Sequence, residues 1–429
     1  MSREIIQQSL EYIEENLKTE ITAEELSAAA GFSLFHYYRV FGQAVGMPVM
    51  QYILQRRLLH ALYEISLGGK QTDVALAYGF ETHAGFYKAF VREFGYTPAH
   101  FLKNYKVRKP YRINLLQEEH IKMTHKKLKE MLTRWGLERE TLTDVVYEDT
   151  GNISESACYV GGEYVIKYSA NRAKVETNLT LSRAMEKTGL LSALPVLTTD
   201  GAEYVQEGEL YFYVTKRIRG KQLKASKMYL KDYETKARYI GEIIGQLDLA
   251  LKEVDALVDD GNLYESVTGW AIPKVKGKLE VSNEVYADYE ETFKALYPKL
   301  PKQIIHRDPN PGNIILAGEQ SGFIDFELSQ RNVRIFDPCY AATAILSETF
   351  TGEKEKLMQW AEIAREILIG YDSVVKLSEE EKQAVPYVML SNQLISTAWF
   401  SEQEKYQELY RTNKKMTEWL AVHAGDLII

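Results

Sequence analysis

The chain has little cysteine and no long apolar run. It contains 2 cysteines, Cys158 and Cys339, among 429 residues, which excludes a disulfide framework, and their positions match no metal-binding spacing. We therefore expect two buried, reduced thiols. No apolar run approaches the roughly 20 residues that span a bilayer, and the Glu-rich start lacks the basic and apolar segments of a signal peptide. The sequence predicts a cytoplasmic protein without a membrane partner.

An excess of positive charge is also lacking. The chain holds 52 Lys and Arg against 60 Asp and Glu, for a formal net charge of -8, and residues 1–110 hold 12 basic and 11 acidic side chains. This balance excludes nucleic-acid binding by the whole surface, so any DNA contact must depend on the local placement of basic groups. The length favours two or three domains over a single core.

A repeated pattern occupies the first hundred residues. The sequence AAGF at 29–32 recurs as AYGF at 77–80, and a Phe followed after five positions by a Gly recurs about 48 residues later. In each copy we predict a short helix, a turn at a Gly and a second amphipathic helix, with one long helix between the copies. The predicted helices are 23–30, 33–44, 49–66, 72–78 and 82–94. Each copy is therefore a candidate helix-turn-helix unit, whose second helix can enter the DNA major groove.

Two such units joined by a long helix resemble the AraC/XylS regulators over residues 3–105. The resemblance implies double-stranded DNA as a partner, with Arg39 suited to a bidentate contact with guanine. The positions that it assigns to base contact are Phe35, Tyr38 and Arg39 in the first copy, and His83, Ala84, Tyr87 and Lys88 in the second. Tyr37, Phe41, Phe86 and Phe90 have core spacing and are expected to pack. The alternative is a helical bundle without a nucleic-acid role, because recognition helices normally carry more Arg and Gln.

A second pattern lies in the run IIHRDPNPGN at 304–313, followed by FIDFE at 323–327. Asp308 precedes Asn313 by five residues on a loop after an apolar strand, and Asp325 follows the next apolar strand. This arrangement puts a proton acceptor beside two oxygen ligands of the kind that magnesium prefers. The alternative is a polar, proline-containing turn between two core strands.

These segments resemble the aminoglycoside phosphotransferase and choline kinase superfamily, relatives of the protein kinases. The resemblance implies that Asp308 accepts or orients the proton of a hydroxyl group on a small-molecule acceptor. It also implies that Asn313 and Asp325 bind Mg²⁺ on ATP or GTP, while His306, grouped with Asp308 as a catalytic candidate, mainly fixes the loop. Asp337 matches a structural Asp of the superfamily, although a helix-capping role is the simpler interpretation.

The same resemblance assigns the nucleotide-binding residues. Lys167 points out of an apolar strand toward the phosphates, with Glu176, or Glu186 as the second choice, as its partner on the following helix. A reduced phosphate-covering loop spans 149–154, with the backbone of Gly151 and the hydroxyl of Ser154 as contacts. The main chain of Lys216 and Ile218 is assigned to the adenine. The alternative for Lys167 is an exposed strand lysine. The alternative for the segment containing Lys216 and Ile218, the expected hinge between the lobes, is simple edge-strand polarity.

Taken together, these patterns predict a multidomain fold, with an all-α double helix-turn-helix domain followed by an α+β two-lobed protein-kinase-like domain. The expected limits are 1–108 for the DNA-binding domain, 109–140 for a basic linker containing a helix over 121–135, 141–220 for the small lobe and 221–429 for the large lobe. Residues 347–429 are expected to be helical, and the acidic run 379–381 to begin a helix. The predicted function is a DNA-binding transcription regulator fused to an ATP-dependent O-phosphotransferase. The alternative is a regulator whose kinase-like domain senses a metabolite or nucleotide without turnover.

Overall fold

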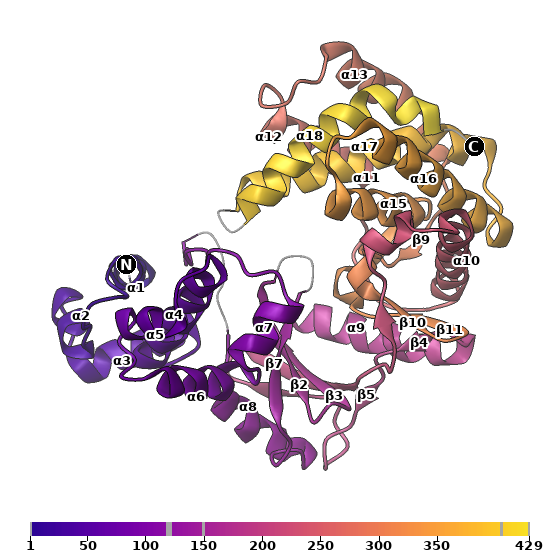
Figure 1. Ribbon diagram of the computed structural model, residues 1–429. Coiled ribbons are helices and arrows are strands. Elements are labelled where there is room, and N and C mark those ends of the chain that lie inside the picture. The colour runs from indigo at the N-terminus through magenta and orange to yellow at the C-terminus, as the bar shows by residue number, and fades with distance from the viewer. Residues whose placement is uncertain (1, 117–121, 148–150, 404–405, 428–429) are drawn as a thin grey trace. The chain divides into compact units, whose positions relative to one another are not determined.

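The computed structural model (Figure 1) describes residues 2–116, 122–147, 151–403 and 406–427. The chain divides into two compact units. The first unit comprises Met1–Ala170 and Val196–Arg217, and the second comprises Asn171–Pro195 and Ile218–Ile429. Among the described residues, no helix combines the length and the apolar character that crossing a bilayer requires.

The first unit begins with seven helices that agree with the predicted repeat. They are α1 (Ser2–Glu15), α2 (Ala23–Ala29), α3 (Leu34–Val45), α4 (Val49–Ser66), α5 (Gln71–Ala77), α6 (His83–Phe94) and α7 (Pro98–Asn104). Local signals explain the boundaries: Thr22 and Glu25 form a capping box at α2, and Gly46 and Gly95 end α3 and α6 in the left-handed conformation. The predicted helix 49–66 coincides with α4.

The apolar faces of these helices form one core. The four aromatic residues predicted to pack, Tyr37, Phe41, Phe86 and Phe90, have no exposed surface, and this prediction is confirmed. α1 and α4 are further joined by Arg56, which donates to the Glu14 carboxylate inside the helical core. His60 and Arg56 hold the pKa of Glu14 down at about 2 although burial alone raises it. This ion pair secures the helix that lies between the two helix-turn-helix copies.

An antiparallel sheet follows the helices in the first unit. Its strands are β1 (Leu142–Val146), β2 (Ile153–Val160), β3 (Tyr164–Ser169), β5 (Pro195–Val196), β6 (Tyr204–Glu207) and β7 (Leu210–Lys216), in the order β1-β2-β3-β7-β5 with β6 beside β7. Helix α8 (His125–Leu132) and a 3-10 turn at Thr133–Trp135 precede the sheet. The predicted helix over 121–135 was wrong at its start, because Thr124 caps α8 and residues 122–124 are not helical; Ile121 lies outside the described residues.

The sheet packs directly on the helical part within the first unit. The Tyr96 hydroxyl donates to the carbonyl of Asp144 on β1 at 3.1 Å, and a Cβ atom at Gly95 would lie 2.7 Å from the carbonyl oxygen of Leu142. Val146 and Ile153 belong to the helical core. The segment before the sheet, predicted as a linker, is also packed, since the Gln7 side chain bonds the backbone of Ile113 and Leu115.

The second unit is mostly helical around two small sheets. Its strands are β4 (Leu191–Ser192), β8 (Lys221–Gln222), β9 (Lys302–Ile305), β10 (Ile314–Ala317), β11 (Gln320–Phe323) and β12 (Gln330–Val333), in the orders β4-β11-β10-β8 and β12-β9. Its helices are α9 (Arg172–Met185), α10 (Tyr233–Lys252), α11 (Leu263–Ser266), α12 (Ile272–Val275), α13 (Asn283–Asp288), α14 (Lys294–Leu296), α15 (Phe336–Thr349), α16 (Lys354–Val374), α17 (Glu379–Ser401) and α18 (Gln407–His423).

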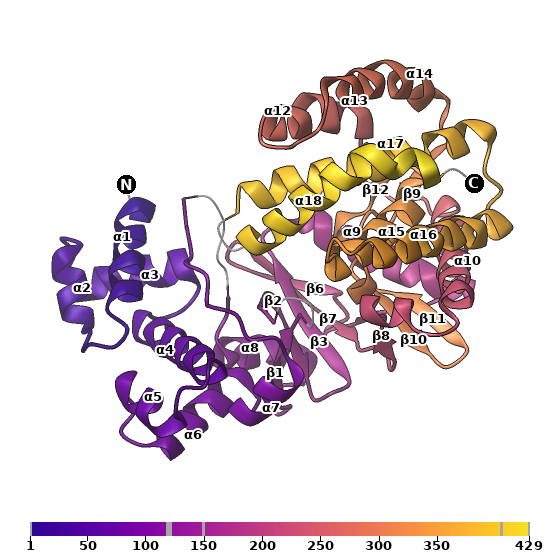
Figure 2. The same cartoon turned by 45° about the horizontal axis from the view of Figure 1, so that its top comes forward.

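Long helices build the core of the second unit (Figure 2). α10 and α16 approach so closely that a Cβ atom at Gly241 would lie 1.9 Å from the Ile367 carbonyl oxygen, and one at Gly370 would lie 2.0 Å from that of Arg238. For the described residues of 347–429, the predicted helical character is confirmed by α16, α17 and α18, whereas residues 404–405 and 428–429 lie outside the description. The acidic run at 379–381 begins α17, where Ser378 and Glu381 form a capping box.

Candidate phosphoryl-transfer site and nucleic-acid interface

The loop that carries Asp308 lies between two buried strands of the second unit. β9 ends at Ile305, which is fully buried, and a 3-10 turn at Pro311–Asn313 leads into β10. β10 pairs with β11 as an antiparallel hairpin, and Asp325 follows β11 after one residue. The backbone nitrogen of Ile324 donates to the Asn313 carbonyl oxygen at 3.0 Å. The two segments that the sequence analysis singled out are therefore adjacent.

Asp308 lies among groups that hold its carboxylate in place. Asn310 donates to Oδ1 at 2.9 Å, Asn313 donates to Oδ2 at 3.1 Å, and the Tyr340 hydroxyl also interacts with the carboxylate. Burial raises the pKa of Asp308 to about 6, against the opposing effect of the hydrogen bonds from Asn310 and Tyr340. A carboxylate with this pKa is ionised at neutral pH and is a stronger base than an ordinary Asp. Tyr340 was missed from sequence because no local motif marks it.

Asn313 and Asp325 each present an oxygen atom beside this loop. The Asn313 amide nitrogen donates both to the Asp308 carbonyl, at 2.9 Å, and to its carboxylate, which leaves the amide oxygen for a ligand. Asp325 is half-buried and has a left-handed backbone with φ of 72°. Such a conformation in a non-glycine residue is uncommon and is concentrated at functional sites.

His306 is buried and holds the loop. Its Nε2 donates to the Ile324 carbonyl at 3.0 Å, so its Nδ1 is the acceptor for the Asp308 backbone nitrogen at 3.3 Å. Burial lowers the pKa of His306 to about 4, so the ring is neutral near pH 7. Nε2 therefore joins the loop to the residue before Asp325, and Nδ1 fixes the loop backbone at Asp308.

The predicted capping role of Asp337 was wrong. Helix α15 has no side-chain cap, and the Asp337 carboxylate instead accepts hydrogen bonds from the backbone nitrogens of His306 at 2.7 Å and Arg307 at 2.9 Å. Arg307 has a left-handed backbone with φ of 70°. Asp337 lies at the first turn of α15, but its carboxylate is directed at the loop, because two buried amides of the loop require an acceptor.

Asp337 has a second buried carboxyl group beside it, which the sequence analysis missed. Asp248 on α10 is buried and accepts a hydrogen bond of 2.6 Å from the Tyr371 hydroxyl of α16. Burial raises the pKa of Asp248 well above its usual value, and the neighbouring Asp337 raises it further. Burial also raises the pKa of Asp337, to about 7, whereas the hydrogen bonds from the His306 and Arg307 backbone and the one with Asp248 lower it. Asp248 is therefore the member of the pair that holds a proton at neutral pH.

The predicted nucleotide-binding residues are distributed between the two units. Lys167 is half-buried on β3 of the first unit, opposite Ala157 and Tyr213 on the neighbouring strands. Glu176 lies on α9 of the second unit and forms an ion pair of 2.8 Å with Arg172, one turn away. The second choice, Glu186, begins the 3-10 turn after α9 and is exposed.

The predicted phosphate-covering loop lies partly outside the described residues. Asp149 and Thr150 lie outside the described residues, whereas Gly151 has φ of 72° and packs against the backbone of Lys106. Ser154 is buried, and its hydroxyl lies 3.4 Å from the backbone nitrogen of Ser156. The contact of the Ser154 hydroxyl with a phosphate therefore stays a prediction.

The hinge residues lie on either side of the division between the units. Lys216 ends β7 opposite Tyr164 of β3, in the first unit. Ile218 lines a cavity of about 780 Å³ in the second unit, together with Leu191, Leu316 and Ala317. Its volume is within the range of roughly 300–1,000 Å³ that small-molecule and cofactor sites occupy.

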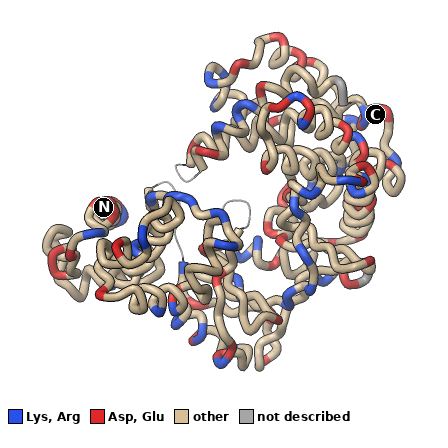
Figure 3. Tube along the Cα trace, viewed as in Figure 1, with Lys and Arg blue, Asp and Glu red and all other residues tan. Residues whose placement is uncertain are grey.

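The predicted DNA-contacting residues lie on the outer faces of α3 and α6. Phe35 is 81% exposed, and Tyr38 and Tyr87 are 38% and 37% exposed. The remaining residues are exposed or, for His83, half-buried: Arg39, His83, Ala84 and Lys88. The Arg39 guanidinium lies 3.2 Å from the ring of His36, a neighbour that the sequence analysis did not consider. Figure 3 shows basic and acidic residues interspersed over the first unit, in agreement with the near-neutral charge of residues 1–110.

Comparisons of the sequence with protein families agree with this division. Residues 26–104 match the family described as Helix-turn-helix domain, and residues 150–372 match the family described as Phosphotransferase enzyme family. The HTH-type transcriptional activator AarP of Providencia stuartii is 34% identical over 96 residues, which are 22% of this chain and 71% of AarP. The probable transcription factor PqrA of Proteus vulgaris is 30% identical over 107 residues, which are 24% of this chain and 88% of PqrA.

Solved structures show the same fold for most of the chain. A microcompartment-associated aminopropanol kinase has a TM-score of 0.53 at 14% identity and covers 70% of this chain and 96% of its own. Amicoumacin kinase hAmiN in complex with AMP-PNP, Ca2+ and Ami has a TM-score of 0.51 at 13% identity. The match covers 68% of this chain and 93% of the kinase chain. The GDP and kanamycin complex of APH(2")-IIia has a TM-score of 0.51 at 14% identity. The match covers 69% of this chain and 98% of the APH(2")-IIia chain. At these identities the likeness establishes the fold alone.

Proposed function

Because this chain belongs to the phosphotransferase enzyme family and also carries an AraC-type helix-turn-helix domain, we propose that it is a DNA-binding regulator joined to an ATP-dependent O-phosphotransferase of small molecules. The observation that carries the enzymatic part is the environment of Asp308. Its pKa of about 6, its hydrogen bonds from Asn310 and Asn313, and a loop held by Asp337 support the role of a positioned base.

In the proposed reaction, Asp308 orients the acceptor hydroxyl and accepts its proton as the oxygen attacks the γ-phosphorus of the nucleotide. The bond from that phosphorus to the β-γ bridging oxygen breaks, and ADP leaves. Asn310, Asn313 and Tyr340 hold the carboxylate in one orientation, so less motion is needed when the acceptor binds. His306 and Asp337 act on the loop backbone and are positioning residues.

Asn313 and Asp325 are the proposed magnesium ligands. Their donor atoms are an amide oxygen and a carboxylate, which are the hard oxygen ligands that this ion requires. The amide nitrogen of Asn313 is already bonded to Asp308, so its oxygen is the atom that remains for the ion. When bound, magnesium neutralises charge on the nucleotide phosphates.

The proposed nucleotide contacts are those that the resemblance to the phosphotransferase superfamily implies. Lys167, on a central strand of its sheet, supplies a positive charge for the α and β phosphates, with Glu176 as its proposed partner. The cavity beside Ile218 supplies an apolar surface for the base, and the main chain of Lys216 and Ile218 supplies hydrogen bonds. ATP and GTP are both consistent with these contacts.

The proposed DNA interface consists of the exposed faces of α3 and α6. Arg39 is the side chain best suited to read a guanine, and Lys88 suits a base or a phosphate. The exposed rings of Phe35, Tyr38 and Tyr87 supply apolar contact area on the same faces. The continuous 18-residue helix α4 between the two copies supports recognition of two adjacent half-sites.

The deciding experiment incubates the purified chain with MgATP or MgGTP and a panel of hydroxyl compounds that includes kanamycin and aminopropanol. Formation of the nucleoside diphosphate is measured with and without each acceptor, and products are identified by mass spectrometry. We expect acceptor-dependent turnover that Asp308→Asn abolishes. If the chain binds nucleotide, yields no product with any acceptor and changes its DNA affinity on binding, the sensor alternative replaces the enzymatic proposal.

A further inference from the structure

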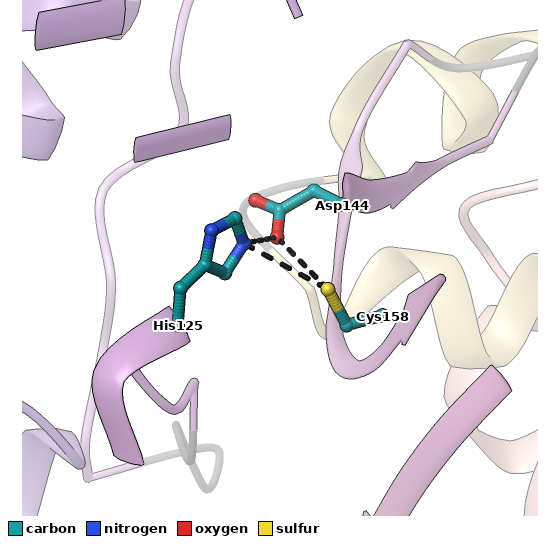
Figure 4. Close-up of side chains that lie close together, drawn as sticks. All are labelled: His125, Asp144 and Cys158. Atoms are coloured by element: carbon teal, nitrogen blue, oxygen red, sulfur yellow. Dashed lines mark hydrogen bonds and ion pairs between the residues drawn. The ribbon is translucent and has the colours of Figure 1, made fainter. Parts of the chain in front are cut away.

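Three side chains capable of binding a metal meet in the first unit, outside the proposed phosphoryl-transfer site. His125 is the first residue of α8, Asp144 lies on β1 and Cys158 lies on β2 (Figure 4). Asp144 and Cys158 are direct cross-strand partners, so their side chains project from the same face of the sheet. Nε2 of His125, Oδ1 of Asp144 and Sγ of Cys158 all lie within 4.8 Å of one another.

The distances within this cluster suit a tetrahedral ion. The Cys158 sulfur lies 3.7 Å from His125 Nε2 and 3.8 Å from Asp144 Oδ1, and those two atoms are 2.8 Å apart. Ligand atoms at zinc bond lengths of about 2.0–2.3 Å are about 3.3–3.6 Å apart in a tetrahedron. The two separations that involve sulfur exceed this range by only about 0.1–0.2 Å. The third opens by about half an ångström when the ion replaces the hydrogen between nitrogen and oxygen.

The surroundings leave the three donor atoms directed at one point. Lys122 donates to Oδ2 of Asp144 at 2.8 Å, which leaves Oδ1 for the ion and makes Lys122 an outer-shell partner of the carboxylate. Asp144 and Cys158 are 2% and 1% exposed, so they are shielded from competing water. His125 is half-buried and keeps one side open to solvent, from which a water molecule can supply a fourth ligand.

The charges also permit an ion at this position. Asp144 forms an ion pair of 2.8 Å with Lys122, so its carboxylate contributes a negative charge to the cluster. The Cys158 thiol donates to the Thr143 carbonyl oxygen, with Sγ 3.2 Å from that oxygen. Metal binding would release that proton, and the thiolate and the carboxylate together would balance a divalent charge.

A catalytic role for the cysteine does not fit this geometry. In a catalytic triad, one ring nitrogen of the histidine contacts the nucleophile and the other contacts the orienting carboxylate. Here the single atom Nε2 of His125 faces both Cys158 and Asp144. The thiol is also almost fully buried, whereas reactive cysteines are partly exposed.

We propose that His125, Asp144 and Cys158 form a zinc site that fastens α8 to β1 and β2. A nitrogen, an oxygen and a sulfur ligand are typical of zinc, and sulfur disfavours magnesium and calcium. The site adjoins the contact between the Tyr96 hydroxyl and the Asp144 carbonyl, which joins the helix-turn-helix part to the sheet. Zinc would therefore stabilise the junction between the DNA-binding helices and the sheet that carries Lys167.

The test uses the full chain and compares four proteins: the parent, Cys158→Ser, His125→Ala and Cys339→Ser. The last is a matched control, because Cys339 is the other buried free cysteine and lies in the second unit. Each protein is treated with a chelator, dialysed against zinc in a metal buffer, and analysed for bound zinc by mass spectrometry. We expect one more zinc ion per chain in the parent and Cys339→Ser than in Cys158→Ser and His125→Ala.

Cobalt(II) supplies a second readout that does not depend on stoichiometry. A cobalt–thiolate bond gives a near-ultraviolet charge-transfer absorption, which is expected in the parent and in Cys339→Ser and absent in Cys158→Ser. Circular dichroism of each protein verifies that it is folded. Equal zinc content in all four folded proteins, or a cobalt spectrum without thiolate absorption in the parent, would overturn the proposal and leave the cluster as an ion pair beside a buried thiol.

Discussion

The carboxylate of Asp337 accepts a hydrogen bond of 2.7 Å from the backbone nitrogen of His306. This bond joins the first turn of α15 to the loop that presents Asp308. The same loop contains a left-handed residue, Arg307, and such a conformation costs about 1–3 kcal/mol unless its surroundings compensate. The second oxygen of Asp337 accepts from the Arg307 nitrogen, so the carboxylate supports the strained peptide itself.

Replacement of Asp337 is therefore expected to affect both stability and turnover. Asp337→Ala leaves two buried amides without an acceptor, at a cost of about 1–3 kcal/mol for each. Asp337→Asn keeps one acceptor oxygen and should have a smaller effect. Urea unfolding and kcat are measured for both variants, and kcat should fall more than the affinity for nucleotide. Unchanged kcat in a folded Asp337→Ala protein would contradict the positioning role.

Asp308→Asn is expected to abolish turnover and leave nucleotide binding intact. The amide is nearly isosteric but accepts no proton, and a positioned general base contributes about 10²–10⁴-fold to the rate. Steady-state kinetics with an identified acceptor and calorimetric titration of MgATP test the two parts separately. Asp255→Asn, a change at an exposed position of the same unit, is the control and should match the parent.

The pH profile should report the raised pKa of Asp308. Since the ionised carboxylate is the active form, kcat/KM should fall about tenfold per pH unit as the pH drops below about 6. It should level off above that value, until another group titrates. An acid limb close to pH 4, the ordinary range of Asp, would show that the carboxyl group is not desolvated or is not the base.

Asp325→Ala is expected to weaken binding of MgATP by at least about tenfold, because even outer-shell partners of metal ligands are worth about 10–100-fold in affinity. Binding of ATP without magnesium should change much less. Calorimetry with and without the metal separates the two effects. Glu319→Ala is the control, since Glu319 is an exposed carboxylate at the turn of the same hairpin. Equal losses with and without magnesium would argue against Asp325 as a ligand.

Selection from random DNA duplexes should return a site with two half-sites about one helical turn, or roughly 10 base pairs, apart. Arg39→Ala should relax the preference at one position and weaken binding by about 1–3 kcal/mol. Arg134→Ala, which removes an exposed arginine after α8, should leave the preference unchanged. If no sequence preference emerges for the parent, the helices form a bundle without a specific DNA-reading role.

Local signals in the sequence were sufficient for the helix-turn-helix part. Capping by Thr22 and the left-handed glycines Gly46 and Gly95 act within a few residues, and α4 was placed without error. The start of α8 was misplaced because a lysine-rich segment continues the helical pattern upstream of the cap at Thr124. The loop with Asp308 and Asn313 was also recognisable from local sequence, because these two residues are only five positions apart.

The sequence by itself determined which elements form and which side chains are available for phosphoryl transfer. Only the tertiary structure decided that Asp337 holds the loop backbone, and that Asp248 and Tyr371 lie behind it, since these residues are far apart along the chain. It also decided that β1 pairs with β2 so that Asp144 faces Cys158. The physical reason is that caps and turns depend on near neighbours, whereas strand register, burial and the resulting pKa shifts depend on the whole packed chain.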